Sequence, residues 1–402
     1  MNILALNAGS SSLTYKLFST TEAGRLVPVA WGKAHHVGVV SCTPSFIEHR
    51  RKDATGKKDV VPIPHHADAF ARVLSWLGQQ NLAIDAVAHR FVHGGHHFSG
   101  ATLIDKDTLA LLRECSVLAP LHNPVSLKII DLVSEHLPGV PQTASFDTAF
   151  HASLPDEATH YAIPLELTRQ YGLKRTGFHG LSYQAVVRQL EDHWPDYRSE
   201  SRVVACHLGT GGASMAAIRN GRPVDTSMGY GTFAGLVMST RCGDLDPAVV
   251  LTLLSKRKCS PHDLERILTR ESGLLGLSGL SSDIRDLLPR WREDPASHAG
   301  LACRVYVRRI KHFLGAFLAL LGGLDILVFT DSVGLTVPEV RAAVCQNMEW
   351  CGLCIDPDKN KAASGDALAA VHSPRSAIQI LVVPNDEELE VAREAAQLLK
   401  AV

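Results

Sequence analysis

Two segments of this chain share one design and lie about half a chain apart. Asn2 to Phe18 and Arg202 to Val224 each run from a short apolar strand, through a turn of small residues, into a second strand. The turns read Asn7-Ala-Gly-Ser-Ser-Ser12 and His207-Leu-Gly-Thr-Gly-Gly212. A length of 402 residues allows two or three domains, so the repeat predicts an internally duplicated protein of two similar α/β domains.

The rest of the sequence alternates between helical and strand patterns, as an α/β fold requires. The predicted helices are 66–79, 107–115, 124–136, 180–194, 247–255, 262–269, 299–321 and 387–400, and the predicted strands are 86–92, 142–146 and 325–330. Asn385 or Asp386 is the expected cap of the last helix. Ser41 to Pro64 is charged and lacks a strong apolar period, which predicts an exposed excursion with no chemical role.

Charge and composition point to a small-molecule partner. Forty basic and 41 acidic side chains leave a net charge of -1, which offers no electrostatic footprint for nucleic acid. Gly322, Gly323 and Asp325 interrupt the apolar stretch 313–329, which therefore predicts a buried helix and strand and no membrane span. The amino terminus lacks the features of a signal peptide, and nine cysteines argue against a disulfide framework. We therefore expect a cytoplasmic protein.

The two turns of small residues suit phosphate binding. Glycine lets backbone N–H groups approach a phosphate closely, and serine or threonine hydroxyls add further donors. A single such turn is more often a tight hairpin, but a pair in duplicated positions favours a polyphosphate site. The chain lacks a P-loop, a dinucleotide fingerprint and a nucleophile elbow, so the corresponding fold classes lose their main support.

Four polar side chains stand in contexts that suit anion or metal chemistry. Arg90 and Arg241 are flanked by glycines, and an arginine fork holds carboxylates or phosphates bidentately, although surface ion pairs are the commoner use. Asp147 follows an apolar strand, where it either serves as a catalytic or metal-binding carboxylate or caps the next turn. His179 lies between glycines at the start of a predicted helix.

These motifs, in their order along nearly the whole chain, resemble the signatures of the acetate kinases and of the broader acetate/propionate/butyrate kinase family. The matching segments are 7–12, 89–95, 120–124, 146–151, 177–180, 224–229, 240–247, 272–285 and 385–389. The resemblance implies the duplicated, actin-like (ribonuclease H-like) two-domain α/β fold with the active site in the interdomain cleft. It assigns 1–149 with 385–402 to the amino-terminal domain, and 150–384 to a carboxyl-terminal domain that holds the nucleotide and the interface of a homodimer.

The activity implied by the resemblance is a reversible, in-line transfer of the terminal phosphoryl group of ATP to acetate or propionate. The products are an acyl phosphate and ADP, and Mg²⁺, or Mn²⁺ in its place, assists. Such a loose transition state needs positioning and positive charge more than a covalent nucleophile. Arg90 and Arg241 would hold the carboxylate and the transferring group, and His179 would donate a hydrogen bond to it. Asp147, Glu387 and Asn7 would organise the metal, with Glu388 as the alternative to its neighbour.

Further site residues follow from the same resemblance. The substrate side comprises Asn7, Arg90, Val92, Leu121, His122, Phe178, Thr232 and Arg241. The nucleotide side comprises Ser10, Ser12, His207, Gly209, Thr210, Gly211, Asp283, Ile284, Arg285, Ser332, Val333 and Gly334.

The chain departs from the family pattern mainly on the nucleotide side. The family's lysine after the Ser-Ser-Ser run is Thr14 here, and a proline of the acyl pocket is Thr232. The adenosine-side motif Thr-Ala-Gly-Ile-Gly-Glu-Asn reads Thr330-Asp-Ser-Val-Gly-Leu-Thr336. Two alternatives follow from these changes: a family member that uses pyrophosphate, polyphosphate or another donor, and a non-catalytic relative that binds acyl phosphate or nucleotide as a regulator.

Overall fold

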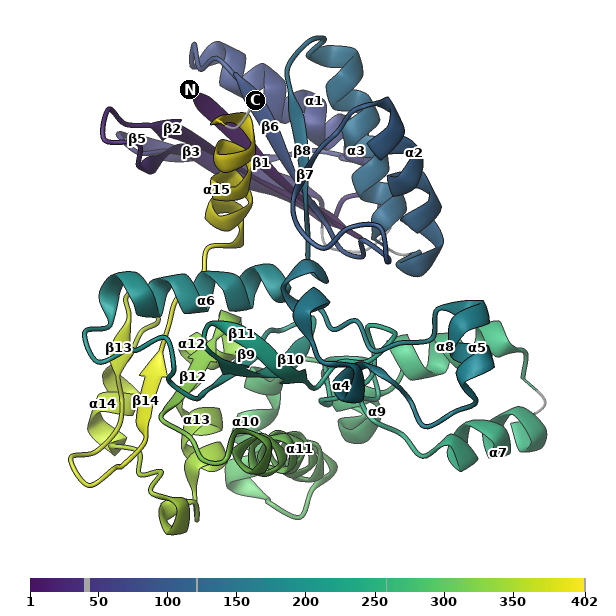
Figure 1. Cartoon of the computed structure of the whole chain (residues 1–402), viewed down its shortest axis with the longest axis vertical. Coiled ribbons are helices and arrows are strands. Elements are labelled where there is room, and N and C mark those ends of the chain that lie inside the picture. The colour runs from purple at the N-terminus through teal and green to yellow at the C-terminus, as the bar shows by residue number, and fades with distance from the viewer. Residues whose placement is uncertain (40–43, 121, 258, 401–402) are drawn as a thin grey trace. The chain divides into compact units, whose positions relative to one another are not determined.

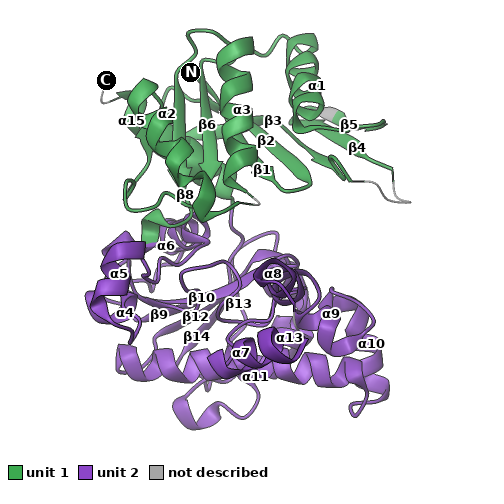
Figure 2. Ribbon diagram, turned by 90° about the vertical axis from the view of Figure 1, so that its right-hand side faces the viewer, with its two compact units in different colours: residues 1–150, 386–402 green, residues 151–385 purple. Residues whose placement is uncertain are grey.

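The computed structural model describes residues 1–39, 44–120, 122–257 and 259–400. The chain forms two compact units, each described by itself below. Unit 1 comprises Met1–Phe150 with Asp386–Val402, and unit 2 comprises His151–Asn385 (Figure 2).

Unit 1 is built on one sheet whose described strands run in the order β5-β4-β3-β2-β1-β6-β8-β7. Strand β1 pairs antiparallel with β2 and parallel with β6, which in turn pairs parallel with β8. The strands are β1 (Asn2–Gly9), β2 (Ser12–Thr20), β3 (Leu26–His35), β4 (Phe46–Arg51), β5 (Ala54–Val60), β6 (Ala86–Phe91), β7 (Thr102–Leu103) and β8 (Gln142–Phe146), and the helices are α1 (His66–Gln79), α2 (Lys106–Glu114), α3 (Asn123–His136) and α15 (Glu387–Lys400) (Figure 1).

Alternate side chains of β1 face different helices, as the period of a strand requires. Leu4 and Leu6 belong to the core that α1 and α3 close, with Phe70 and Val73 of α1 fully or almost fully buried. The next residue, Asn7, lies on the opposite face of the strand and meets the first turn of α15, where its amide donates to Glu388. The strand thus carries a polar residue on the face that α15 covers.

Unit 2 repeats this plan with a sheet in the order β11-β10-β9-β12-β14-β13. Its strands are β9 (Val203–Leu208), β10 (Ala213–Arg219), β11 (Arg222–Thr226), β12 (Ile326–Thr330), β13 (Ala369–Ala370) and β14 (Gln379–Val382). Its helices are α4 (Asp156–Thr159), α5 (Leu165–Tyr171), α6 (Gly180–His193), α7 (Pro247–Arg257), α8 (Pro261–Arg270), α9 (Gly273–Ser278), α10 (Ile284–Glu293), α11 (His298–Leu321), α12 (Asp331–Thr336), α13 (Pro338–Cys345) and α14 (Pro357–Ala362) (Figure 1).

The two sheets share a five-strand order, which confirms the predicted duplication. In unit 1 the order is β3-β2-β1-β6-β8, and in unit 2 it is β11-β10-β9-β12-β14. In both, an antiparallel hairpin supplies the first and second strands, and two parallel strands extend the sheet beyond the first. The two turns of small residues therefore occupy equivalent positions.

The predicted helices and strands all form, with ends shifted by no more than two residues. Asp386 is the cap of α15, because its side chain accepts the N–H of Leu389 at 3.0 Å. The apolar stretch after residue 313 ends α11 and continues as β12, as predicted, and no helix among the described residues is long and apolar enough to span a membrane.

The segment 41–64 is mostly exposed where it is described, as expected, but it forms two strands that were not predicted. Residues 40–43 lie outside the described part, but β4 and β5 extend the sheet beyond β3. The buried face of β4 consists of Ile47 and His49, and His49 stacks on Trp76 and hydrogen-bonds Tyr15 at 2.6 Å. A histidine in a buried strand position hid the alternating pattern that would have predicted the strand.

Candidate active site

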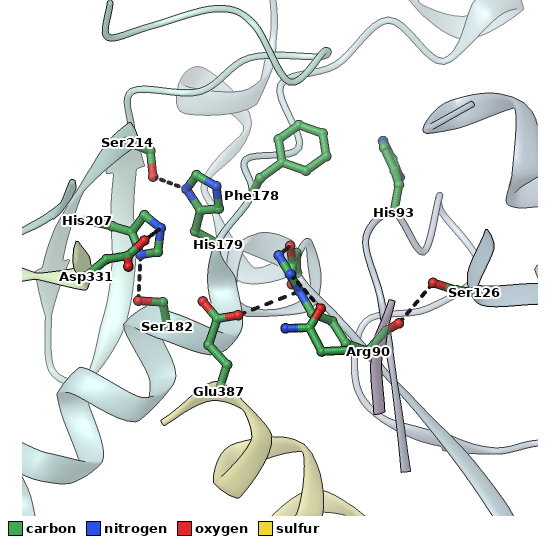
Figure 3. Close-up of polar contacts among 12 residues, drawn as sticks. Arg90, His93, Ser126, Phe178, His179, Ser182, His207, Ser214, Asp331 and Glu387 are labelled. Carbon is green, nitrogen blue, oxygen red and sulfur yellow. Dashed lines mark hydrogen bonds and ion pairs between the residues drawn. The ribbon is translucent and has the colours of Figure 1, made fainter. Parts of the chain in front are cut away.

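In unit 1, polar side chains gather around Arg90 at the end of β6 (Figure 3). Asp147, which directly follows β8, binds the guanidinium bidentately, with Nε to Oδ1 at 2.9 Å and Nη2 to Oδ2 at 2.6 Å. Nη1 donates to Asn7 Oδ1 at 3.0 Å, and Glu387 Oε2 lies 3.7 Å from Nε. Parallel pairing of β1, β6 and β8 brings these strand ends to one edge of the sheet.

Buried charge dominates this cluster. Burial by itself would lower the pKa of Arg90, but the carboxylates of Asp147 and Glu387 outweigh it and raise the pKa above its ordinary value. Asp147 is 1% exposed. Glu388 adds a third carboxylate, which accepts from Asn7 Nδ2 at 3.2 Å. One guanidinium therefore faces three carboxylates, and the surplus of negative oxygen atoms suits a hard cation.

In unit 2, His179 takes a strained backbone conformation at the start of α6. Its φ of 58° lies in the left-handed region, which costs a residue other than glycine roughly 1 kcal/mol. The preceding turn requires glycine at position 177, because a Cβ there would lie 2.6 Å from the ring of His151. His151 Nε2 in turn hydrogen-bonds the carbonyl of Phe178 at 3.0 Å. The fold thus specifies where the imidazole of His179 points.

The ring of His179 stacks on that of His207, at the end of β9. The ring centroids are 4.1 Å apart and the planes differ by 23°. A buried serine holds the Nδ1 atom of each ring at 2.8 Å: Ser214 for His179 and Ser182 for His207 (Figure 3). Both rings are therefore held through Nδ1 by a serine hydroxyl.

The turn between β9 and β10 brings His179 and Arg241 together. A Cβ on Gly212 would lie 3.4 Å from His179 Nε2 and 3.6 Å from Arg241 Nη1, so both nitrogen atoms flank the same backbone position. Arg241 Nη1 also donates to the carbonyl of Thr232 at 2.8 Å. Glycine at this position leaves room for an anion to approach both groups.

Arg241 is a half-buried cation, and no carboxylate of the described residues pairs with it. Burial lowers its pKa, although a guanidinium stays protonated in proteins. Amides at the start of α9 bind the loop that carries it: Leu274 N donates to Met238 O at 2.9 Å, and Ser272 N donates to Thr240 O at 3.0 Å. A half-buried positive charge without a carboxylate partner among the described residues, on a loop held by these hydrogen bonds, is suited to bind an anionic ligand.

The sequence profile of the Acetokinase family matches residues 2–393. The chain belongs to this family. The acetate kinase of Dictyoglomus turgidum is 40% identical over 406 residues, which cover 99% of this chain and 98% of that protein. The solved structure of acetate kinase from Entamoeba histolytica has a TM-score of 0.88 at 39% identity, covering 100% of each chain. A propionate kinase from Francisella tularensis has a TM-score of 0.89 at 31% identity, covering 98% of each chain.

The repeated sheet and the similarity to solved acetate kinases identify the fold of the chain as the duplicated, actin-like fold. Some residues predicted for the site have their hydrogen-bond partners outside the two clusters described above. In this family member Asp283 and Arg285 pair with each other at the start of α10, with Nε to Oδ1 at 2.9 Å, and Ile284 is buried. Leu121 lies outside the described residues.

The other predicted residues have varied surroundings. Val92 and Phe178 are buried, Ser12, His122 and Thr232 are half-buried, and Ser10 is exposed in the turn after β1. On the nucleotide side, Gly209 and Thr210 belong to the turn after β9, as does Gly211, whose carbonyl accepts from Ser239 at 3.2 Å. Val333 and Gly334 are buried in α12.

Asp331 and Ser332, which differ from the family motif at the start of α12, contact the end of β9 and the turn after it. Parallel pairing of β12 with β9 places Thr330 opposite His207. Asp331 then reaches His207, with Oδ2 2.9 Å from Nε2, and Ser332 Oγ accepts the N–H of Thr210 at 3.0 Å. Asp331 does so at a left-handed φ of 61°, and a Cβ on Gly209 would lie 2.4 Å from its carboxylate. Both departures from the family motif therefore contact the end of β9 or the turn that follows it.

Sequence reasoning missed Asn123, Tyr183, Ser214 and Asp331 as residues that support the site. Buried Asn123 joins the loop after β6 to the segment before α3, accepting from His93 N at 3.2 Å and donating to Cys115 O at 2.7 Å. It belongs to the motif at 120–124, which was a usable signal. The other three are recognisable only from pairings across the fold.

The Asp331–His207 pair makes stability depend on acidity. Burial by itself would raise the pKa of Asp331, but the charge of His207 and hydrogen bonds from His207 and Ser332 lower it from 3.8 to about 2. A carboxyl whose pKa is lower in the folded state stabilises the fold above its ordinary pKa and loses this effect as the pH falls.

We therefore expect Asp331→Asn to destabilise unit 2 by about 1 kcal/mol at pH 7, an amount reduced by the one-third exposure of the side chain. The difference from the wild type should shrink as the pH falls from 4 towards 2. Urea unfolding of both proteins at pH 7, 5 and 3, followed by a probe in unit 2, measures it. A destabilisation that stays constant over this range would contradict the assignment.

Proposed function

We propose that the protein catalyses the reversible transfer of the terminal phosphoryl group of ATP to acetate, giving acetyl phosphate and ADP. The observation that carries the proposal is the meeting of His179 Nε2 and the uncompensated cation Arg241 at Gly212. Full-length similarity to named acetate kinases and to a propionate kinase supports a carboxylate as the acceptor.

The reaction suits these groups because it needs no general base. A carboxylate is already deprotonated at neutral pH, so one of its oxygens can attack the γ-phosphorus directly while the bond to the β,γ-bridging oxygen breaks. ADP leaves with that electron pair, and no proton is exchanged. Arg241 and a hydrogen bond from His179 then stabilise the negative charge on the transferring phosphoryl group. Positioning and electrostatics supply the catalysis.

We propose that the cluster around Arg90 serves the same reaction. The fork of Arg90 would bind an anionic oxygen of the substrates, while Asp147 and Asn7 orient the guanidinium through the hydrogen bonds described above. Val92, Phe178 and Thr232 would accept the methyl end of the carboxylate.

Magnesium belongs to the same proposal, with Mn²⁺ as the alternative. The described residues contain no set of three His, Cys, Asp or Glu side chains that could hold a metal, and Mg²⁺ commonly needs only one or two carboxylates, with waters and substrate phosphates as its other ligands. The surplus of carboxylate oxygens beside Arg90 fits that requirement. Asp147 and Glu387, with Asn7, would hold the ion, and Glu388 is the neighbouring alternative. When bound, Mg²⁺ neutralises phosphate charge.

A cytoplasmic homodimer completes the proposal. All eight described cysteines are free thiols, which fits a reducing compartment. Light scattering after gel filtration would measure the mass against 43.5 kDa for one chain, and a particle of one chain's mass would reject the dimer.

Acyl phosphate formation can be assayed directly by trapping the product with hydroxylamine. Acetate, propionate and butyrate are each supplied with Mg²⁺ and ATP, and parallel reactions replace ATP with GTP or pyrophosphate. We expect product with ATP and acetate or propionate. No acyl phosphate with any pair, and no ATP from acetyl phosphate and ADP, would exclude the kinase. Product only with pyrophosphate would overturn the choice of donor.

A further inference from the structure

Two buried hydroxyls lie behind His179 in a chain of hydrogen bonds. Ser214 on β10 and Tyr183 on α6 are both 0% exposed. Tyr183 OH lies 2.5 Å from Ser214 Oγ, which lies 2.8 Å from Nδ1 of His179. Figure 3 shows Ser214 on the side of the imidazole that carries Nδ1. The serine therefore links a phenol to the imidazole.

The chemistry of the three groups determines which group donates in each of these hydrogen bonds. The phenol is the most acidic of them, and burial raises its pKa, so it stays protonated and can donate throughout the working pH range. The neutral imidazole nitrogen is the strongest acceptor. Tyr183 thus donates to Ser214, and Ser214 donates to Nδ1 of His179. Successive hydrogen bonds of the same sense polarise one another and strengthen the chain.

An imidazole that accepts through Nδ1 carries its proton on Nε2. Nε2 is the atom that flanks Gly212 beside Arg241. The opposite tautomer would present a lone pair there, which would repel a phosphoryl oxygen where a donor is required. The chain from Tyr183 therefore determines whether His179 donates to a phosphoryl group or repels it.

We propose that Tyr183 and Ser214 are positioning residues that hold His179 as the neutral Nε2–H tautomer. This inference rests on the proposed function, in which His179 donates to the transferring group. The charged and titratable groups around the ring include Arg241 beside Nε2, the stacked His207, and Asp331, which binds Nε2 of His207. The hydroxyl chain contacts the ring at Nδ1, whereas these three groups lie on its other sides.

The kinetic test removes one hydroxyl at a time. Ser214→Ala is expected to lower kcat about 10- to 100-fold, and Tyr183→Phe about 3- to 10-fold, with little change in the KM for acetate or ATP. Ser214→Thr, which keeps the hydroxyl, should recover most of the loss. The matched control is Tyr306→Phe in α11, because that tyrosine is also buried and its hydroxyl has no hydrogen-bond partner among the described residues.

A spectroscopic test needs no turnover. In protein labelled with ¹⁵N-histidine, Nδ1 and Nε2 shifts report which nitrogen carries the proton, and the signal of His179 is identified by its absence in His179→Gln. We expect Nε2–H in the wild type and in Tyr306→Phe, and a mixture of tautomers in Ser214→Ala. An Nδ1–H wild type, or an unchanged tautomer in Ser214→Ala, would overturn the inference. Because this readout uses the resting protein, it separates failure of the inference from failure of the kinase proposal.

Discussion

Arg241→Ala is expected to lower kcat for acyl phosphate formation by about 10³-fold or more, by analogy with arginine fingers in other phosphoryl transfer enzymes. The reason is its environment: a half-buried guanidinium with no carboxylate partner among the described residues, whose Nη1 lies with His179 Nε2 beside Gly212. Alanine removes the positive charge that the transferring group meets. Steady-state assays with ATP and acetate measure the loss.

Two variants make this prediction specific. Arg241→Lys keeps the charge but loses the planar fork, so its activity should lie between those of the wild type and the alanine variant. Arg266→Ala removes an exposed arginine of α8 that pairs with Glu271, and should leave the rate unchanged. Thermal unfolding should show that unit 2 still folds in all three. Near-normal turnover by Arg241→Ala would overturn the placement of the phosphoryl group.

The duplication could be predicted because each copy begins with a hairpin that is visible in a short stretch of sequence. Each hairpin is short, continuous in sequence and marked by a turn of small residues, so β1–β2 and β9–β10 were both evident. The parallel strands β6, β8 and β12 were also predicted from their apolar residues, whereas the parallel strand β14 was not. Strand β4 was missed because His49 occupies one of its buried positions, where Trp76 and Tyr15 satisfy it from other elements. Such satisfaction exists only in the folded chain.

The supporting residues of the candidate site were hidden for a related reason. Asp331 was seen only as a departure from a motif, and its partner His207 is 124 positions away, across parallel strands. Tyr183 and Ser214 look in sequence like an ordinary helical tyrosine and an ordinary strand serine. Only the packing of α6 on β9 and β10 makes them a pair behind His179. The type of a side chain predicts what chemistry it can perform, whereas its contacts in the fold determine which other residues it acts with.

Arg90→Ala is expected to lose about 10³-fold or more in rate and also to destabilise unit 1. The two effects have different causes. The rate falls because the substrates lose a guanidinium, whereas stability falls because Asp147, bound bidentately and 1% exposed, would keep a buried charge without its partner. Removing one partner of a buried ion pair typically costs about 3–5 kcal/mol.

A second substitution separates these causes. Asp147→Asn added to Arg90→Ala removes the unpaired charge with almost no change in volume, so unit 1 should regain most of the lost stability while the rate stays low. Calorimetry of the wild type, both single variants and the double variant gives the coupling between the residues, and assays of the same proteins give the rate. If the double variant regained activity together with stability, Arg90 would be a structural residue, and its placement in the candidate site would be wrong.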